Sequence, residues 1–413
     1  MERATLLYFL ENSHPETGLV RDKAHSFPPF DDDKNAMASI GATGFGLAVV
    51  ANAADRGLLQ RAWARELFDK TMRTCQSQLK REHGWFLHFV HWGTGQDGWW
   101  PYNDYSSIDS ALLIAGALYA AQVFPESEGA RIAHQLYVDL DFDWLMTDGG
   151  RFPDRRTLSI GYSSKEGFSH YQWSIYAEQM ILVLLGLGHP TRPLPPETWT
   201  AWERRVYQAN GFEGVALDMP LFVHQYSHLF VDLRQFKDGF ANYFENSVTA
   251  TRFNRHVCRT DSQHKMGDFW GLSAGAAPGQ NAGTSTYRVY DPFRHEGTIC
   301  IACAIGSAQF TPDEVLSDAE AWWRGPYANQ IWGRYGFVDS LNLDQSWFAP
   351  ETFGITAGAA YLSLANLEER TSIWHRFHAI PEIQAALARA SQAGPVQTKK
   401  EPLRESSSLN PNL

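Results

Sequence analysis

The sequence predicts an all-α protein, an (α/α)6 toroid, which is a six-hairpin barrel whose long loops form a cleft on one face. Three observations support this fold class. About twelve segments repeat apolar residues at helical spacing, strand signals are sparse, and no long Pro/Gly/Ser linker divides the 413 residues. We therefore expect one domain over residues 1–392. The polar composition of residues 393–413 predicts a disordered tail.

The expected helices are segments in which apolar residues recur at i, i+3, i+4 and i+7. In chain order they cover residues 2–12, 36–55, 59–80, 107–123, 127–146, 171–187, 197–209, 221–234, 238–258, 297–307, 311–324 and 355–369. Thr311 to Glu314 supplies an N-cap, a first-turn proline and two acids, and Pro195 to Thr198 opens a helix in a similar way. Gly186 to Pro190 is a stop signal.

Long connections between these helices contain the unusual residues. They are rich in Gly, Trp, Asp and Tyr and cover residues 13–35, 84–106, 147–170, 260–296 and 325–354. Loops on a rigid scaffold often carry function. We therefore expect the functional site to lie among them.

Composition narrows the class of ligand. The net charge is −11 and no block of Lys or Arg is present, which argues against a nucleic-acid partner. No apolar run of about 18 residues predicts a membrane span. The 15 Trp residues are a mild signal for carbohydrate, weighed evenly against a Trp-rich core. The N-terminus does not read as a signal peptide, so the expected location is the cytoplasm, or the periplasm or exterior if a leader was removed.

Metal and cofactor signals are weak. Cys300 and Cys303 form a C-x-x-C pair in an apolar context without a second half-site, so buried free thiols are expected for all four cysteines. His224 and His228 are the best metal alternative, but they lack a third ligand. No nucleotide-binding, serine-hydrolase or zinc-protease motif is present. We expect no metal and no cofactor.

Four carboxylates are candidates for acid–base chemistry. Glu178 lies among aromatic residues just before a strongly apolar run, where burial would raise its pKa as a general acid requires. Asp109 and Glu296 each begin an expected helix, and Glu351 lies in or beside a long loop. Each has a structural alternative, either a favourable interaction with a helix dipole or an ion pair with an arginine.

The segment Pro220–Thr251 mixes aromatic, apolar and hydrogen-bonding groups at helical spacing. Its wet face carries His, Gln, Tyr and Ser where an ordinary amphipathic helix carries Lys and Glu. This mixture predicts a wall shared between the protein core and a sugar-binding cleft. Asp232 and Arg234 within it also fit a structural ion pair.

Several sequence blocks, in order from about residue 6 to about residue 370, resemble the bacterial glucoamylase-like glycoside hydrolases. That family includes endo-β-1,2-glucanases and the glucanotransferase domain of cyclic β-1,2-glucan synthases. The blocks are HPETGLVRDK (14–23), ASIGATGFGLAVVANAADRG (38–57), SSIDSALLIAGAL (106–118), YAEQMILVLLGLGHPTRPLP (176–195), PLFVHQYSHLFVDLR (220–234), EGTICIACAIGSAQFTPDEVL (296–316), YGFVDSLN (335–342) and FGITAG (353–358).

The resemblance implies an (α/α)6 barrel that cleaves β-1,2-linked glucans without metal or nucleotide. It places Glu178 at the position of the general acid and Asp109 at an acidic position of the cleft. Two acids found in relatives are replaced here, by Ser106 and by Thr356. The general base is therefore left open between Glu351, Asp339 and Glu296.

The first hypothesis is an endo-β-1,2-glucanase in which Glu178 protonates the leaving oxygen and a second carboxylate activates water. The alternatives are a β-1,2-glucanotransferase, a glycosidase of another linkage, and an inactive glucan-binding protein. The expected partner is an oligo- or polysaccharide, bound by a monomer or small homo-oligomer. Residues expected to stack on or bond to sugar are Trp99, Trp100, Trp173, His224, Gln225, Tyr226, Arg234, Trp270 and Trp347.

Overall fold

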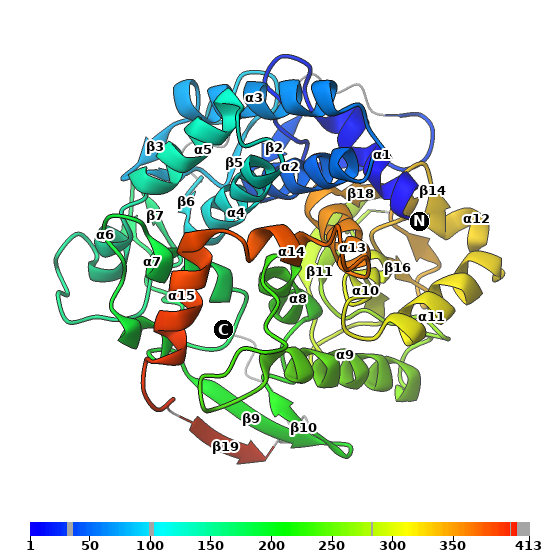
Figure 1. The fold of residues 1–413 in the computed structure, drawn as a ribbon. Helices are drawn as coiled ribbons and strands as arrows, with labels where there is room; N and C mark the ends of the chain where they lie inside the picture. The colour runs from blue at the N-terminus through cyan, green and yellow to red at the C-terminus, as the bar shows by residue number, and fades with distance from the viewer. Residues whose placement is uncertain (31–35, 99–102, 282–283, 397, 403–413) are drawn as a thin grey trace.

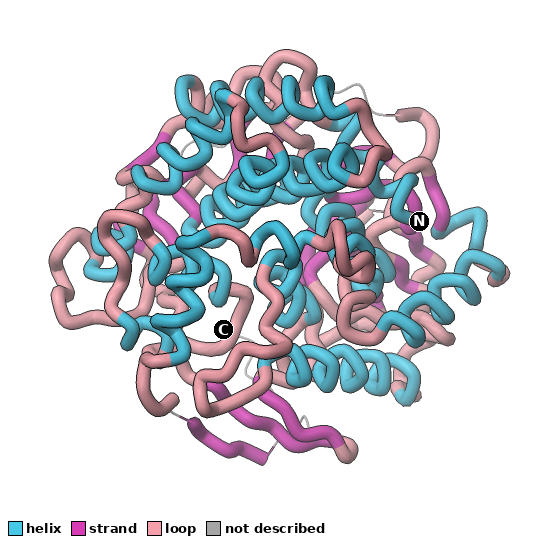
Figure 2. Tube along the Cα trace, in the orientation of Figure 1, coloured by secondary structure: helices cyan, strands magenta, loops and turns pink. Residues whose placement is uncertain are grey.

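The structure is a computed structural model that describes residues 1–30, 36–98, 103–281, 284–396 and 398–402. Helices predominate and the sheets are small, with two or three strands each (Figures 1 and 2). Among the described residues, none of the helices combines the length and apolarity needed to cross a bilayer.

Six helices, most of them almost entirely buried, contact one another in a closed cycle. The cycle runs from α2 to α4, α7, α8, α10 and α13 and back to α2. These helices are rich in Ala, Gly and Leu, and small side chains let them approach closely; at Gly44 an added Cβ would lie 2.3 Å from the Leu112 carbonyl oxygen. Their bounds are α2 Ile40–Asp55, α4 Ser107–Val123, α7 Met180–Gly188, α8 Leu221–Phe230, α10 Ile301–Ile305 and α13 Gly354–Ala365.

A second set of helices packs outside the first, as Figure 1 shows for α3, α9, α11 and α15. The three longest, α3, α9 and α11, are amphipathic, because one face packs inward and the other meets solvent. The bounds are α1 Glu2–Asn12, α3 Arg61–Ser77, α5 Glu128–Asp139, α9 Tyr243–Thr260, α11 Pro312–Arg324 and α15 Pro381–Ser391. Shorter helices are α6 Phe142–Thr147, α12 Ala328–Ile331, α14 Ile373–Phe377 and the 3₁₀ turn η1 Pro196–Trp199.

The strands are short and mostly join loops at the start of the inner helices. The two-stranded pairs are β1 Lys23–His25 with β18 Glu351–Phe353, β2 Met37–Ser39 with β5 Phe89–His91, β3 Arg81–Glu82 with β4 Trp85–Phe86, β11 Ala274–Pro278 with β12 Ser285–Val289, and β14 Trp332–Gly333 with β15 Gly336–Phe337. The three-stranded sheets are β6 Tyr105–Ser106, β7 Gly161–Ser163 and β8 Gly167–Phe168; β10 Phe212–Val215, β9 Arg204–Ala209 and β19 Thr398–Pro402; and β13 Thr298–Ile299, β16 Leu341–Asn342 and β17 Trp347–Phe348.

Several helix predictions need correction. The helix expected over 197–209 is wrong, because η1 is followed by strand β9, and Asn210 and Gly211 at positive φ form the tight turn of the β9–β10 hairpin. The helix expected over 171–187 begins only at Met180. Before it, Ile175 bridges to Glu203 as extended chain. The expected helix 127–146 divides into α5 and α6.

Two further expectations differ from the structure. Cys300 and Cys303 are joined by a disulfide at the start of α10, so the expected free thiols are wrong for this pair, whose Cα atoms lie 5.2 Å apart. Cys75 and Cys258 are free and buried, as expected. In the tail, residues 398–402 pair with β9 as β19, and residues 403–413 lie outside the described residues. The single domain over 1–392 stays a prediction.

Candidate active site

Four carboxylates gather where the inner helices begin. They are Asp22, Asp109, Glu178 and Asp339. The negative charge of each raises the pKa of the phenol of Tyr287 in the β11–β12 hairpin. Tyr287 is 50% exposed, and partial burial together with these four negative charges raises the pKa of its phenol, which therefore keeps its proton. Segments from five parts of the chain thus lie close enough for their charges to influence one phenol.

Glu178 stands directly before α7. Its backbone carbonyl accepts a hydrogen bond of 2.7 Å from Ser227 Oγ, and the same Ser227 oxygen accepts from the Ile181 N–H, so α8 holds the start of α7 in place. Burial, together with the negative charge of Asp109, raises the pKa of Glu178 to about 7. The carboxyl group can therefore hold a proton near neutral pH.

Asp339 lies between β15 and β16 and is completely buried. Its Oδ2 accepts hydrogen bonds from the Ala276 N–H at 2.7 Å and from Ser340 Oγ at 2.9 Å. Burial raises the pKa of Asp339 to about 6, while the bonds from Ala276, Ser340 and the Thr356 side chain act in the opposite direction. Asp339 is therefore mostly ionised at pH 7.

Asp109 occupies the first turn of α4, where the helix dipole favours a negative charge. Ser106 caps this helix and donates from Oγ to Asp109 Oδ2 at 2.6 Å. His88 Nε2 lies 3.4 Å from the same carboxylate oxygen. Gly41 of α2 leaves the room that Asp109 needs, because an added Cβ would lie 2.6 Å from Oδ1.

Asp22 was not among the residues predicted from the sequence. It precedes β1, and its backbone bonds to Met37 and to Gly354, the first residue of α13. Burial raises the pKa of Asp22 to about 6, with His88 and Lys23 lowering it and two neighbouring acids raising it further. No periodic pattern marks this residue; the pairing of β1 with β18, from the far end of the chain, brings it to the site.

One of these acids, Asp22, lines a cavity of about 430 Å³ together with Tyr287. Its lining is mainly apolar, with a few polar groups, a composition typical of small-ligand sites. The lining residues include Asp22, Lys23, His88, Phe89, Tyr287 and Phe353.

The other two candidate acids differ from each other. Glu351 is buried in β18, where its carboxylate lies 3.7 Å from Lys23 Nζ and accepts a hydrogen bond from Ser285 Oγ. Its negative charge raises the pKa of Asp339. Glu351 therefore borders the acid cluster. Glu296 is exposed by 39% and bonds to Tyr290 and Arg288. It does not begin a helix, as the sequence predicted, because β13 comes first and α10 starts at Ile301.

The α8 residues that were predicted to line a sugar-binding cleft fall into two groups. Tyr226 is half-buried against Phe45, and the charges of Glu178, Asp339 and Asp109 act on its hydroxyl, so it borders the acids. His224 and Gln225 are 1% exposed. His224 Nε2 bonds to the Ala216 carbonyl and Gln225 Nε2 to the Cys303 carbonyl, so both lie in the core and not on a wall open to sugar.

The tryptophans predicted to stack on sugar also differ in their burial. Trp173 and Trp270 are buried and donate from Nε1 to Ser107 and to Asp318 respectively, which are core positions. Trp347 is half-buried in β17. Trp99 and Trp100 lie outside the described residues.

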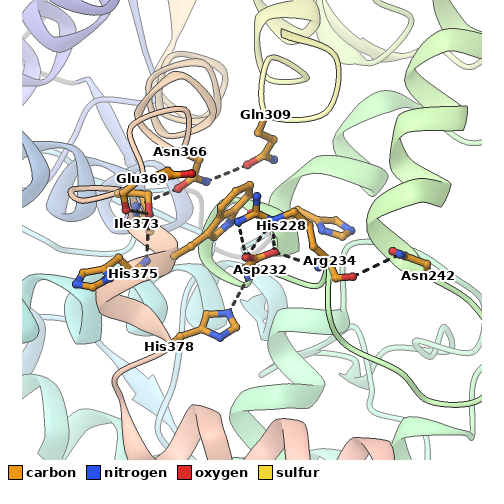
Figure 3. Close-up of polar contacts among 12 residues, drawn as sticks. His228, Asp232, Arg234, Asn242, Gln309, Asn366, Glu369, Ile373, His375 and His378 are labelled. Atoms are coloured by element: carbon orange, nitrogen blue, oxygen red, sulfur yellow. Dashed lines mark hydrogen bonds and ion pairs between the residues drawn. The ribbon is translucent and has the colours of Figure 1, made fainter.

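Arg234 lies far from the acids, beyond the C-terminal end of α8. Figure 3 shows its guanidinium on Asp232, with Gln309 and Asn366, which follow α10 and α13, nearby. The guanidinium also covers the Trp374 ring at 4.8 Å from the ring centre. These groups line a second cavity of about 550 Å³ at the end of the helices opposite to the acid cluster.

The fold agrees with comparisons to known proteins. Residues 170–381 match the Glycoamylase family, described as "Putative glucoamylase", and the chain belongs to this family. The resemblance noted in the sequence is thereby confirmed.

Among curated proteins, the chain is 24% identical to an exo-β-1,2-glucooligosaccharide sophorohydrolase (non-reducing end) of Parabacteroides distasonis. The match covers 94% of this chain and 57% of the relative, so the chain spans little more than half of that protein's length.

Two solved structures are similar in fold. The endo-β-1,2-glucanase of Chitinophaga pinensis, in a sophorotriose and glucose complex, superposes with a TM-score of 0.82 at 23% identity, over 94% of this chain and 96% of the other. The β-1,2-glucanase of Parabacteroides distasonis gives a TM-score of 0.83 at 23% identity, over 95% of this chain and 59% of the other.

Proposed function

We propose that this protein is a glycoside hydrolase that cleaves β-1,2-linked glucan, most simply as an endo-β-1,2-glucanase. Family membership and the activities named for its relatives support the reaction class and the linkage. The observation that carries the proposal is the group of four carboxylates around Tyr287, in which burial separates the protonation of Glu178 from that of Asp339. One of the four, Asp22, lines a cavity.

In this proposal Glu178 is the general acid. Hydrolysis of a glycosidic bond needs one protonated carboxyl group to give a proton to the leaving oxygen and one carboxylate to act on the other side of the sugar. A pKa of about 7 for Glu178 and about 6 for Asp339 leaves the first group partly protonated and the second ionised between these values. Asp339 is therefore the proposed general base, which accepts a proton from the attacking water.

The two hydroxyl residues that stand where relatives have acids, Ser106 and Thr356, also fit this assignment. The Ser106 hydroxyl donates to Asp109, and the Thr356 side chain acts on Asp339 as a hydrogen-bond donor. The Thr356 hydrogen bond favours the ionised form of Asp339. We infer that Ser106 and Thr356 orient and tune the acids that perform the reaction. Asp109, close to Glu178, in turn keeps the proton on the general acid.

We further infer that the helices form an (α/α)6 toroid. The closed cycle of contacts through α2, α4, α7, α8, α10 and α13, with outer helices packed around it, supports this architecture. In such an arrangement the starts of the inner helices lie at one mouth of the barrel. Asp109 at the start of α4 and Glu178 before α7 agree with that expectation.

Product analysis tests the proposed function. Purified protein incubated with linear β-1,2-glucan should release new reducing ends and short β-1,2-gluco-oligosaccharides, with little action on β-1,3- or β-1,4-glucan. Chains that are redistributed in length without new reducing ends would indicate a transferase. Binding of the glucan without any change in its length would reject an enzyme.

A further inference from the structure

A group of potential metal-ligating side chains lies outside the acid cluster, where two loops meet. Asp261 ends α9, His264 follows it in the next loop, and His295 precedes β13. Each of the three offers one ligand atom, and these atoms all lie within 4.8 Å of one another. Two imidazoles and one carboxylate form a donor set that suits Zn²⁺ and related divalent transition ions.

The imidazole of His264 is already oriented for such a role. Its Nδ1 lies 3.0 Å from Asp344 Oδ2, and a carboxylate can only accept, so Nδ1 carries the hydrogen and donates it. The lone pair is then on Nε2. Asp344 is itself held, because its Oδ1 accepts from the Lys265 N–H. A carboxylate behind a ligating histidine is the usual supporting contact of zinc sites.

The other two members carry polar atoms without partners. Asp261 Oδ2 and His295 Nδ1 are buried and form no hydrogen bond within the described residues. The Asp261 and His295 side chains are exposed by 10% and 13%, and His295 Nε2 lies 3.9 Å from Asp261 Oδ2. That separation is too long for a hydrogen bond, and leaving buried polar atoms unpaired is costly.

The position of Asp261 adds a second reason to expect a cation. It is the C-cap residue of α9, where the negative end of the helix dipole disfavours a carboxylate. Its other oxygen accepts from the Gln263 N–H, which leaves Oδ2 directed to the histidines. A bound cation would offset the dipole and the carboxylate charge together.

We propose that Asp261, His264 and His295 bind one Zn²⁺ ion as a structural site, with water as a fourth ligand. Zinc–ligand bonds of about 2.0–2.2 Å place tetrahedral ligands roughly 3.4 Å apart, so the three side chains would close by about 1 Å on binding. The ion joins the loop after α9 to the segment that returns from the β11–β12 hairpin. Because that hairpin carries Tyr287, the ion fixes the base of the element that borders the acid cluster.

Metal binding by the parent protein is the direct test. The full chain, purified without a polyhistidine tag and stripped with a chelator, is titrated with ZnCl₂ by calorimetry and loaded with Co²⁺ for visible spectroscopy. We expect one Zn²⁺ per chain, a higher thermal unfolding midpoint with the ion, and a tetrahedral Co²⁺ absorption that Zn²⁺ displaces. A parent protein without saturable Zn²⁺ binding overturns the proposal and leaves an ordinary His–Asp contact.

Variants locate the ion. His264→Ala and His295→Ala should abolish the saturable binding, and Asp344→Ala should weaken it by about 10–100-fold. His134→Ala, at an exposed position of α5, is the matched control and should bind as the parent does. Equal affinity in His264→Ala, His295→Ala and parent overturns the assignment. If a variant fails to fold, the stoichiometry and Co²⁺ spectrum of the parent decide, because a single tetrahedral site with nitrogen and oxygen ligands is expected.

Discussion

The carboxylates at the two ends of the inner helices have pKa shifts in opposite directions. At the starting end, Glu178 and Asp339 lie among other acids, and burial raises the pKa of both. At the other end, Asp232 faces Arg234 (Figure 3); burial raises the pKa of Asp232, but the hydrogen bonds from Arg234 outweigh it and the net shift is downward. Both ends have a cavity and polar groups.

The difference separates acids that can exchange protons near pH 7 from acids that cannot. A carboxylate bonded to a guanidinium is ionised throughout the physiological range and serves as a fixed charge. A buried carboxylate next to like charges can hold a proton and release it. The end where burial raises the pKa of the acids is therefore the proposed site of chemistry, and the end with the Asp232–Arg234 ion pair is proposed to be structural.

The largest expected effect is loss of activity at the starting end. Glu178→Gln should lower the rate of β-1,2-glucan hydrolysis by about 10²–10⁴-fold, because it removes the proton donor while keeping the shape. The paired control, Asp232→Asn, changes an acid of the other end and should leave the rate within about twofold. Reducing-end assays on both variants provide the comparison, and similar losses in the two would remove the distinction between the ends.

The same Glu178→Gln variant should be more stable than the parent at high pH. The pKa of Glu178 is raised from 4.5 to about 7 in the folded protein. Ionising this group therefore lowers the free energy of unfolding progressively from about pH 4.5 to pH 7, and the loss is complete above pH 7. Removing the charge should add about 3 kcal/mol to the free energy of unfolding at pH 8. The gain should shrink as pH falls through 7 and vanish near the ordinary pKa. Urea unfolding at pH 8 and pH 5 measures it; an equal effect at both values would contradict the assignment.

A smaller effect is expected for Thr356→Val. The Thr356 hydrogen bond lowers the pKa of Asp339, so its loss should raise that pKa above about 6. For the parent, kcat/KM should fall below about pH 6 as Asp339 gains a proton and above about pH 7 as Glu178 loses one. The variant should move the acid limb to higher pH and leave the alkaline limb in place. A uniform drop without any movement would mean that Thr356 acts only on packing.

The smallest effect belongs to the ion pair of the other end. Arg234→Met removes a half-exposed guanidinium from Asp232, and exposed pairs contribute about 0–1 kcal/mol. The aliphatic Met side chain keeps some cover over Trp374. Thermal unfolding should therefore change little and hydrolysis not at all. Loss of glucan binding in this variant would return Arg234 to the substrate-binding role that the sequence predicted.

The sequence predicted much of the helical framework. The helices expected over 2–12 and 107–123 have the same bounds in the structure, and the Ser106 cap marks the start of the second. The β9–β10 hairpin was missed although Asn210-Gly211 is a known hairpin signal. The Cys300–Cys303 disulfide was missed because the apolar residues around this pair are compatible with free buried thiols as well as with a disulfide.

The candidate site was predicted only in part, for a physical reason. Glu178 and Asp109 were identified because each stands beside the start of an apolar helix. Asp22 lies in a loop without any period, and long-range strand pairing brings it to the cluster. His224 and Gln225 satisfy a helical pattern for a wet face, yet they form hydrogen bonds inside the core. A sequence pattern does not show which polar groups are satisfied internally.

A structure of Glu178→Gln with a β-1,2-gluco-oligosaccharide tests the central claim most directly. A glycosidic oxygen should lie within hydrogen-bond reach, about 2.6–3.2 Å, of the residue 178 side chain, with a water held by Asp339 on the other side of the sugar. An oligosaccharide bound instead in the cavity beside Asp232 and Arg234, with the acid cluster empty, would contradict the account.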